Sequence, residues 1–179
     1  MTPGADLMAD SGHVDYGEMV STEKRFLADS MLGKLARWLR VMGFDTHYQP
    51  YYDEKTMDRI INDGFTLLSR HRKKILRYPA HSILILSDRV EHQLQELRKT
   101  GYIPSHRSRW FTRCLLCNTL LKAVSVKDAR ENIPEYVYYQ NVPEVRFCPS
   151  CGRYFWPGSH RNRMVNQLRE WGITSRGPL

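Results

Sequence analysis

The sequence has no long apolar run and few cysteines, and its acidic residues are outnumbered by basic ones. No window approaches the roughly 18 consecutive apolar residues that a membrane helix needs, and residues 1–21 lack the basic and apolar regions of a signal peptide. We therefore expect a cytoplasmic protein without membrane contact. The 179 residues have 41% apolar content, which suits one domain or a domain with a small appendage and excludes several independent domains.

The shortage of acids is uneven along the chain. Nineteen Asp and Glu residues stand against 27 Lys and Arg residues, which gives a net charge of +8. Residues 1–24 carry −4, so residues 25–179 carry +12. A body with this charge attracts phosphates by releasing counterions, so nucleic acid is the leading partner class, and a merely soluble basic surface is the alternative. Residues 1–24 show no regular period and are expected to form a mobile acidic tail.

Short apolar runs then alternate with amphipathic stretches. The expected strands are residues 26–28, 46–49, 65–69 and 83–87, and the expected helices are residues 31–42, 55–62 and 90–99. This alternation predicts an α/β domain over residues 25–108, with a parallel sheet flanked by helices. Residues 109–160 show paired cysteines and strand-like runs such as residues 136–139. Residues 161–179 are expected to form a C-terminal helix and tail.

Two Cys-x-x-Cys pairs dominate the second part of the chain. Cys114 and Cys117 form the first pair, and Cys148 and Cys151 form the second after 30 intervening residues. Each pair offers two thiolates from one tight turn, so the two turns together predict a closed, structural zinc site in a small zinc-ribbon module. Disulfides are the alternative, and a cytoplasmic location disfavours them.

Carboxylates occur where expected strands give way to helices. Asp29 and Asp88 each end an apolar strand and open a helix, so they would lie at the edge of a parallel sheet where ligands bind. There they could hold Mg²⁺ or Mn²⁺ for attack on a phosphodiester. Asp53 is a further carboxylate between the second and third strands. The alternative is helix capping, because Asp is a preferred N-cap and Asp88 with Glu91 resembles a capping box.

Basic side chains form three groups. One third of the circumference of the helix over residues 31–42 carries Lys34, Arg37 and Arg40, which could follow a phosphate backbone or simply face solvent. Two stretches rich in basic and aromatic residues flank the cysteines and include Arg109, Arg113, His160 and Arg161. Their rings could stack on unpaired bases, or they could pack the zinc module against the α/β domain.

Several motifs in the same order resemble the Mut-seven C-terminal ribonuclease family. They are Phe-Leu-Ala-Asp-Ser-Met-Leu-Gly-Lys-Leu-Ala-Arg-Trp-Leu-Arg at residues 26–40, Phe-Thr-Arg-Cys-Leu-Leu-Cys-Asn at residues 111–118, Cys-Pro-Ser-Cys-Gly at residues 148–152 and Tyr-Phe-Trp-Pro-Gly-Ser-His at residues 154–160. The resemblance implies a PIN-like nuclease fold joined to a zinc ribbon. It also implies a metal-dependent RNA-cleaving site with Asp29, Asp53 and Asp88 as its acids.

The chain departs from this family after the third strand. Members often show Thr-Arg-Asp there, whereas this chain reads Ser-Arg-His at residues 69–71, followed by Arg72, Lys73 and Lys74. Replacing a carboxylate with the imidazole of His71 weakens Mg²⁺ binding, and the cations repel the ion further. The same residues, His71, Arg72 and Lys73 among them, would hold RNA.

Three functional hypotheses follow from the sequence. The first is an RNA-binding, metal-dependent ribonuclease that His71 weakens. The second is a catalytically inactive module that binds RNA or a protein partner on a nuclease fold. The third is a toxin-like or regulatory interaction protein whose acidic tail competes for its own basic cleft. No sequence feature specifies an oligomeric state.

Overall fold

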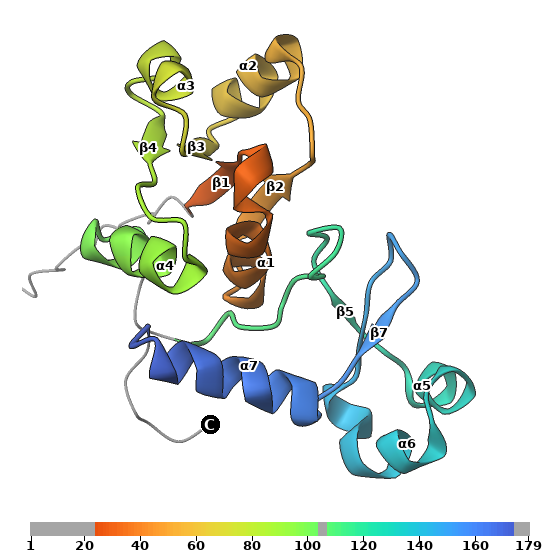
Figure 1. The fold of residues 1–179 in the computed structure, drawn as a ribbon. Helices are drawn as coiled ribbons and strands as arrows, with labels where there is room; N and C mark the ends of the chain where they lie inside the picture. The colour runs from red at the N-terminus through yellow and green to blue at the C-terminus, as the bar shows by residue number, and fades with distance from the viewer. Residues whose placement is uncertain (1–23, 104–106, 174–179) are drawn as a thin grey trace, which may run out of the picture.

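The computed structural model describes residues 24–103 and 107–173, so the expected acidic tail lies outside the described residues apart from Lys24. The first part of the chain alternates strands and helices around a four-stranded parallel sheet (Figure 1). Its elements are β1 (Arg25–Ala28), a 3-10 turn (Ser30–Leu32), α1 (Gly33–Val41), β2 (Asp45–Tyr48), α2 (Glu54–Asn62), β3 (Thr66–Ser69), α3 (Arg72–Arg77), β4 (Ser82–Leu84) and α4 (Val90–Lys99). The predicted parallel sheet flanked by helices is confirmed.

The two faces of the sheet are covered by different helices. Phe26 and Leu68 belong to the main core, together with side chains of α1 and α4. Their neighbours Leu27 and Leu67 belong to a second core with Met57 and other side chains of α2. Successive residues of a strand point to opposite faces, which explains why adjacent strand residues enter different cores. The sheet is therefore buried on both sides, as parallel sheets are.

The strand order β2-β1-β3-β4 creates a switch point in the topology. The chain leaves β1 towards β2 on one side and leaves β3 towards β4 on the other, although β1 and β3 are neighbours. Ligands in open α/β sheets bind where adjacent connections diverge in this way, beyond the carboxyl ends of the strands. At this point lie Asp29, which follows β1, and Ser69, which ends β3.

A small antiparallel sheet forms the second part of the chain. Its strands are β5 (Lys122–Ala123), β6 (Arg146–Phe147) and β7 (Tyr154–Phe155), and between β5 and β6 lie α5 (Val126–Asn132), α6 (Glu135–Asn141) and a 3-10 turn (Val142–Glu144). We call residues 112–156 the zinc module. Four buried residues from α5, α6 and the following segment form its own apolar cluster.

The expected strand-like run at residues 136–139 is wrong, because these residues belong to helix α6. Val137 is buried in the small cluster, whereas Tyr136 and Tyr139 are 67% and 72% exposed. A tyrosine-rich run favours a strand on propensity alone, but packing of one helical face overrides this preference. Proline residues also favour the start of a helix, and Pro134 precedes this one.

Helix α3 was not expected, and the strand expected over residues 83–87 is shorter, at Ser82–Leu84. Four of the six residues of α3 are Lys or Arg, and none of the six is buried, so the sequence shows no apolar period there. The helix is held by ion pairs instead. The Arg77 guanidinium forms ion pairs with the carboxylates of Glu54 at 2.7 Å and Asp58 at 3.2 Å.

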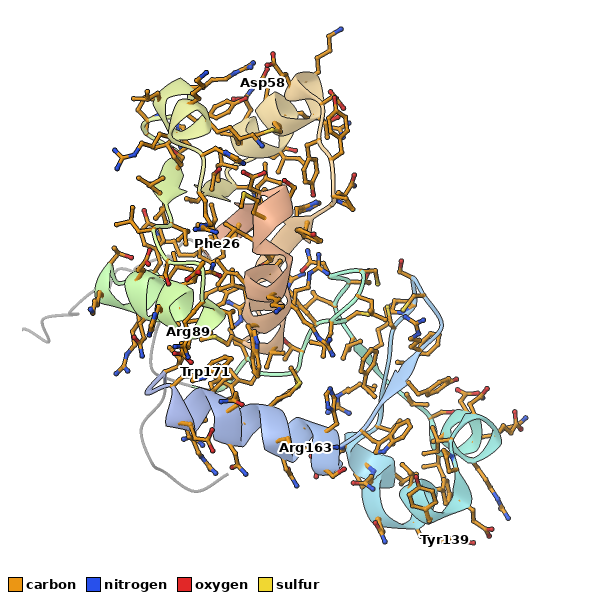
Figure 2. All side chains as sticks on the ribbon, in the orientation of Figure 1. Phe26, Asp58, Arg89, Tyr139, Arg163 and Trp171 are labelled. Carbon is orange, nitrogen blue, oxygen red and sulfur yellow. The ribbon has the colours of Figure 1, made fainter. Side chains whose placement is uncertain are left out.

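The last helix returns the chain to the main core. Helix α7 (Ser159–Glu170) contributes Met164 and Leu168 to that core, and the Trp171 ring lies 4.8 Å from the Trp38 ring of α1. Figure 1 shows α7 running beneath α1 and α4, and Figure 2 shows Trp171 at the end nearest α4. No helix among the described residues is both long and apolar enough to cross a membrane.

The prediction of a basic stripe on α1 is wrong for Arg40. Lys34 and Arg37 are exposed, but Arg40 is only 5% exposed and its guanidinium faces the first cysteine turn. It donates to the backbone oxygens of Thr46 at 3.0 Å and Leu116 at 2.7 Å. Its charge is thus used to join α1 to the zinc module, which removes it from the surface offered to phosphate.

Arg113 makes a second buried connection. Its guanidinium is hydrogen-bonded to the Gly43 and Asn118 oxygens and lies 3.4 Å from Asp45. Gly43 itself, with φ +87°, lies against the backbone of Arg109, and only glycine suits this position, because a Cβ there would lie 2.2 Å from the Arg109 oxygen. The expected RNA-binding role of Arg113 therefore competes with a structural one.

We expect Arg40→Met to destabilise the protein by about 2–4 kcal/mol, because it leaves buried carbonyl groups without their donor. Arg37→Met is the matched control, since Arg37 lies one turn away on the exposed side of the same helix. Urea denaturation followed by circular dichroism measures both changes. Equal effects of the two substitutions would contradict the buried connection.

Candidate functional site

Asp29 lies at the carboxyl end of β1, where the chain turns into α1. Its backbone N–H donates to the Leu68 oxygen at 3.0 Å, which continues the pairing of β1 with β3. Its side chain accepts from the Ser30 N–H at 2.6 Å and so caps the short turn that precedes α1. The capping alternative considered from the sequence is therefore realised at Asp29.

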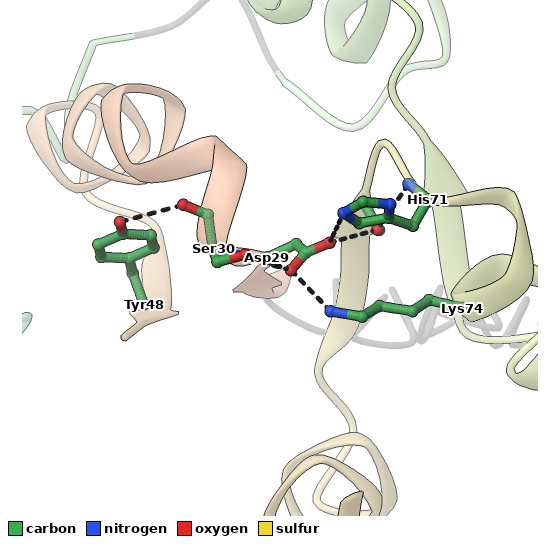
Figure 3. Close-up of polar contacts among 6 residues, drawn as sticks. Asp29, Ser30, Tyr48, His71 and Lys74 are labelled. Atoms are coloured by element: carbon green, nitrogen blue, oxygen red, sulfur yellow. Dashed lines mark hydrogen bonds and ion pairs between the residues drawn. The ribbon is translucent and has the colours of Figure 1, made fainter. Parts of the chain in front are cut away.

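The same carboxylate has further partners on the neighbouring strand and helix. Its side chain is 2% exposed. Oδ2 accepts from the Ser69 hydroxyl at 2.6 Å, and Oδ1 lies 2.8 Å from the Lys74 Nζ. The Nε2 of His71 is 3.9 Å from Oδ2. Figure 3 shows His71 and Lys74 approaching Asp29 from the side opposite to Ser30.

These contacts set the ionisation of Asp29. Burial raises the pKa of this carboxyl, but the hydrogen bonds from Lys74, Ser69 and Ser30 outweigh burial, and the pKa lies below its ordinary value. The site at neutral pH is thus a buried carboxylate paired with a half-exposed ammonium group.

A cavity of about 420 Å³ opens above Asp29. Its walls include Tyr51 and Tyr52 from the segment before α2, and Lys73 and Arg77 from α3. The hydroxyl oxygen of Tyr52 is buried and has no hydrogen-bond partner among the described residues, and burial raises its pKa to about 12. The cavity therefore combines cations and aromatic rings with the carboxylates of Asp29 and Glu54.

The other two expected acids do not form with Asp29 a group whose oxygens are close enough to share an ion. Asp53 is exposed, and its carboxylate caps α2 by accepting from the N–H and hydroxyl of Thr56 at 2.9 and 2.6 Å. Asp88 is exposed as well, and no described residue donates a hydrogen bond to its side chain; Arg89, not Asp88, is the N-cap of α4. The capping box suggested for Asp88 is thus wrong.

A catalytic Mg²⁺ or Mn²⁺ does not fit the residues around Asp29. Within the described parts of the chain, the cysteines are the one group of three or more His, Cys, Asp or Glu side chains that could share an ion. Hard divalent ions require several oxygen ligands. Asp29 faces the Lys74 ammonium group, and the other carboxylate that lines the cavity, that of Glu54, is paired with Arg77 at 2.7 Å. Lys74 was the residue that sequence reasoning missed as the partner of Asp29. Its signal was the run of cations after β3, which was interpreted as repulsive to metal and as RNA-binding, not as a partner for Asp29.

The four cysteines, by contrast, fit zinc. The Sγ atoms of Cys114 and Cys151 are 3.6 Å apart, those of Cys117 and Cys148 are 3.4 Å apart, and all four lie within 4.8 Å of one another. Four sulfurs at about 2.3 Å from a tetrahedral zinc ion are about 3.8 Å apart. The residues described here could therefore bind one zinc ion, with a structural role because every position is filled by sulfur.

The two cysteine turns have matching backbones. The N–H groups of Asn118 and Gly152 donate to the oxygens of Cys114 and Cys148, each at 3.0 Å. Both residues have positive φ, at 70° and 71°. Asn and Gly are the residues that accept this conformation most readily, so the residue after each second cysteine suits a metal-binding turn.

The remaining expected RNA contacts lie on three elements. His71, Arg72 and Lys73 are exposed beside the Asp29 cavity. His160 is exposed in the first turn of α7, and Arg161 pairs there with Glu144 at 3.1 Å. Arg109 lies in the loop that packs on Gly43.

Comparison with known proteins gives one family. A family model described as the Mut7-C RNAse domain matches residues 24–168. No curated protein matches the chain, and no solved structure matches it.

We expect the purified protein to contain one zinc ion and Cys117→Ser to lose it, because zinc binding and folding of such small modules are coupled. Ser150→Ala, within the second cysteine turn, is the control that keeps all four thiolates. Native mass spectrometry measures the zinc content. A zinc-free protein with disulfides between the cysteines would contradict the site.

We also expect Asp29 to make stability depend on pH. Its pKa is lowered by folding, so its contribution is complete above the unfolded value of about 3.9 and is lost as the pH falls through the folded value. Asp29→Asn should therefore cost about 1–2 kcal/mol at pH 7 and much less near pH 2. Urea denaturation at a series of pH values measures the difference, and a constant difference would contradict the ion pair.

Proposed function

The chain belongs to the family of Mut7-C RNAse domains, and on this premise we propose that it binds RNA at the carboxyl edge of its parallel sheet, with the Lys74 ammonium in the place beside Asp29 that a divalent ion would otherwise take. The proposal makes RNA binding the main activity of this edge. Mg²⁺- or Mn²⁺-dependent cleavage is then weak or absent.

One observation carries this proposal, namely the 2.8 Å contact between Lys74 Nζ and Asp29 Oδ1. An ammonium group at this distance supplies the positive charge that a buried carboxylate needs. It also repels a second cation, and Asp53 and Asp88 do not form with Asp29 a group close enough to share an ion. The lysine thus replaces the charge of an ion without its Lewis acidity or its water ligands.

The surroundings of the pair support RNA as the ligand. Lys73 lines the cavity with an exposed positive charge, whereas Arg77 there is paired with Glu54, and Tyr51 offers a ring that is 77% exposed. Residues 25–179 carry +12, so counterion release favours a polyanion. Phosphates attracted by the cations would bring sugars or bases against the tyrosines, which suits RNA better than a small inorganic anion.

A metal-dependent ribonuclease is the second candidate. The family match over residues 24–168 and the position of Asp29 at the switch point favour it. It requires that Lys74 swing away and that further oxygen ligands assemble around Asp29.

We expect wild-type protein to bind single-stranded RNA with an affinity that falls steeply with salt, and to cleave it little when Mn²⁺ is added. Lys74→Glu should place a second carboxylate beside Asp29, create Mn²⁺ binding and increase Mn²⁺-dependent cleavage about tenfold or more. Fluorescence anisotropy measures RNA binding, and gel analysis of labelled RNA measures cleavage. Lys127→Glu makes the same charge change on α5, far along the chain from Asp29, and is the control.

Each arm of this experiment decides a separate part of the proposal. Absence of RNA binding by the wild type at low salt would refute the RNA-binding role. Rapid Mn²⁺-dependent cleavage by the wild type, abolished by Asp29→Asn, would replace the proposal with the second candidate. Metal is added in the assay and never chelated, so that the zinc module stays intact.

A further inference from the structure

A second and larger cavity lies away from Asp29, where the zinc module meets the loop before it and the start of α7. Its volume is about 630 Å³. Six aromatic side chains line it: Trp110, Phe111, Tyr136, Tyr154, Phe155 and Trp156. We call this cavity the aromatic cleft. Most of these residues come from the two basic and aromatic segments that flank the cysteines in the sequence. The fold brings the two segments together at this cavity.

The cleft is positively charged as well as aromatic. Arg146, His160 and Arg161 line it, together with Arg113, whose guanidinium is already paired with Asp45, and Glu144 is the one acidic residue among its lining residues. Glu144 is already paired with Arg161 at 3.1 Å. A ligand for this cleft should therefore carry both negative charge and flat apolar surface, which excludes an apolar or basic ligand.

The backbone at Phe111 is held in an uncommon conformation that presents its ring to the cleft. Phe111 has φ 59°, a left-handed value that is rare for bulky residues. Its N–H donates to the Val41 oxygen at 2.8 Å, and the Arg161 guanidinium lies 5.1 Å from the centre of its ring. Strained residues of this kind concentrate at binding and catalytic sites.

The start of α7 adds to the positive character of the cleft. Gly158, Ser159 and His160 line the cavity, and the first turn contains no acidic residue. The N-cap Gly158 makes no side-chain hydrogen bond, so the first backbone N–H groups of this 12-residue helix are not capped by its N-cap residue. They complement the arginines as donors to an anion.

We propose that the aromatic cleft binds unpaired bases of single-stranded RNA, with the bases stacked on its rings and the adjoining phosphates held by Arg161 and the start of α7. This inference rests on the proposed RNA binding and specifies its substrate class. In an RNA duplex the faces of the bases are already stacked on one another, so only unpaired bases can enter. Stacking accepts any base, so the cleft selects strandedness and not sequence.

The first test measures stacking directly in the unchanged protein. Of the four tryptophans, Trp110 and Trp156 line the cleft, whereas Trp38 and Trp171 form a pair elsewhere. Titration with a single-stranded RNA should quench tryptophan fluorescence, because a stacked base quenches an indole ring. An abasic oligonucleotide of the same length, which keeps the phosphates, and an RNA duplex should quench little.

The second test uses two tyrosines of α6. Tyr136 lines the cleft and is 67% exposed, whereas Tyr139 is 72% exposed and does not line it. Figure 2 shows Tyr139 at the outer edge of the molecule. Tyr136→Ala should weaken single-stranded RNA binding about fivefold or more and leave binding of the abasic oligonucleotide unchanged. Tyr139→Ala removes an equally exposed ring and should leave both affinities unchanged.

The outcomes separate this inference from the proposed function. RNA binding without quenching, and with the same affinity in Tyr136→Ala, would overturn the aromatic cleft as a base-binding site and leave RNA binding at the Asp29 edge standing. Equal quenching by the abasic oligonucleotide would also overturn it, because phosphates alone would then explain the signal. No binding of any RNA would overturn both proposals.

Discussion

A carboxylate that is 2% exposed at the end of a parallel strand must be neutralised, and the ion pair between Asp29 and Lys74 meets this requirement. The strand order forces the problem, because it brings the ends of β1 and β3 together and so places the carboxylate between two strands. Ser69 supplies one hydrogen bond from β3, and α3 supplies the ammonium. A short helix without buried residues is thereby fixed over the edge of the sheet by charge, not by apolar packing.

A similar use of buried charge joins the two parts of the chain. Arg40 extends from α1 to the backbone oxygens of the first cysteine turn, and Arg113 extends from that turn to Gly43. Each guanidinium satisfies carbonyl groups that would otherwise be buried without a donor. Zinc would fix the turn that carries these carbonyl groups. Loss of the metal should therefore destabilise the packing of α1 as well as the zinc module.

The sequence predicted the parallel sheet because short apolar runs and amphipathic helices leave clear periods, and it predicted the cysteine cluster because the pairs have metal-ligand spacing. It did not predict α3, whose stability depends on ion pairs with residues distant in sequence, such as Glu54. It placed Arg40 on an exposed stripe, because helical periodicity does not reveal what packs against a helix. It also treated Asp29, Asp53 and Asp88 as one set, although position after a strand says nothing about the direction of a side chain.

The two proposed sites are linked by helix α1. The helix begins just after Asp29, and the Gly43 that follows it packs against the backbone of Arg109, next to the first aromatic residues of the cleft. The nine residues of α1 span about 13.5 Å, which is the length of a few nucleotides of an extended strand. Lys34 and Arg37 are exposed along this helix, and if both proposals hold, they are the α1 cations available to the phosphates of a strand that occupies both sites. The bases of such a strand would stack in the aromatic cleft, and its backbone would lie beside Asp29 and Lys74. Under both proposals, the cleft would then determine that only single-stranded RNA reaches the edge of the sheet.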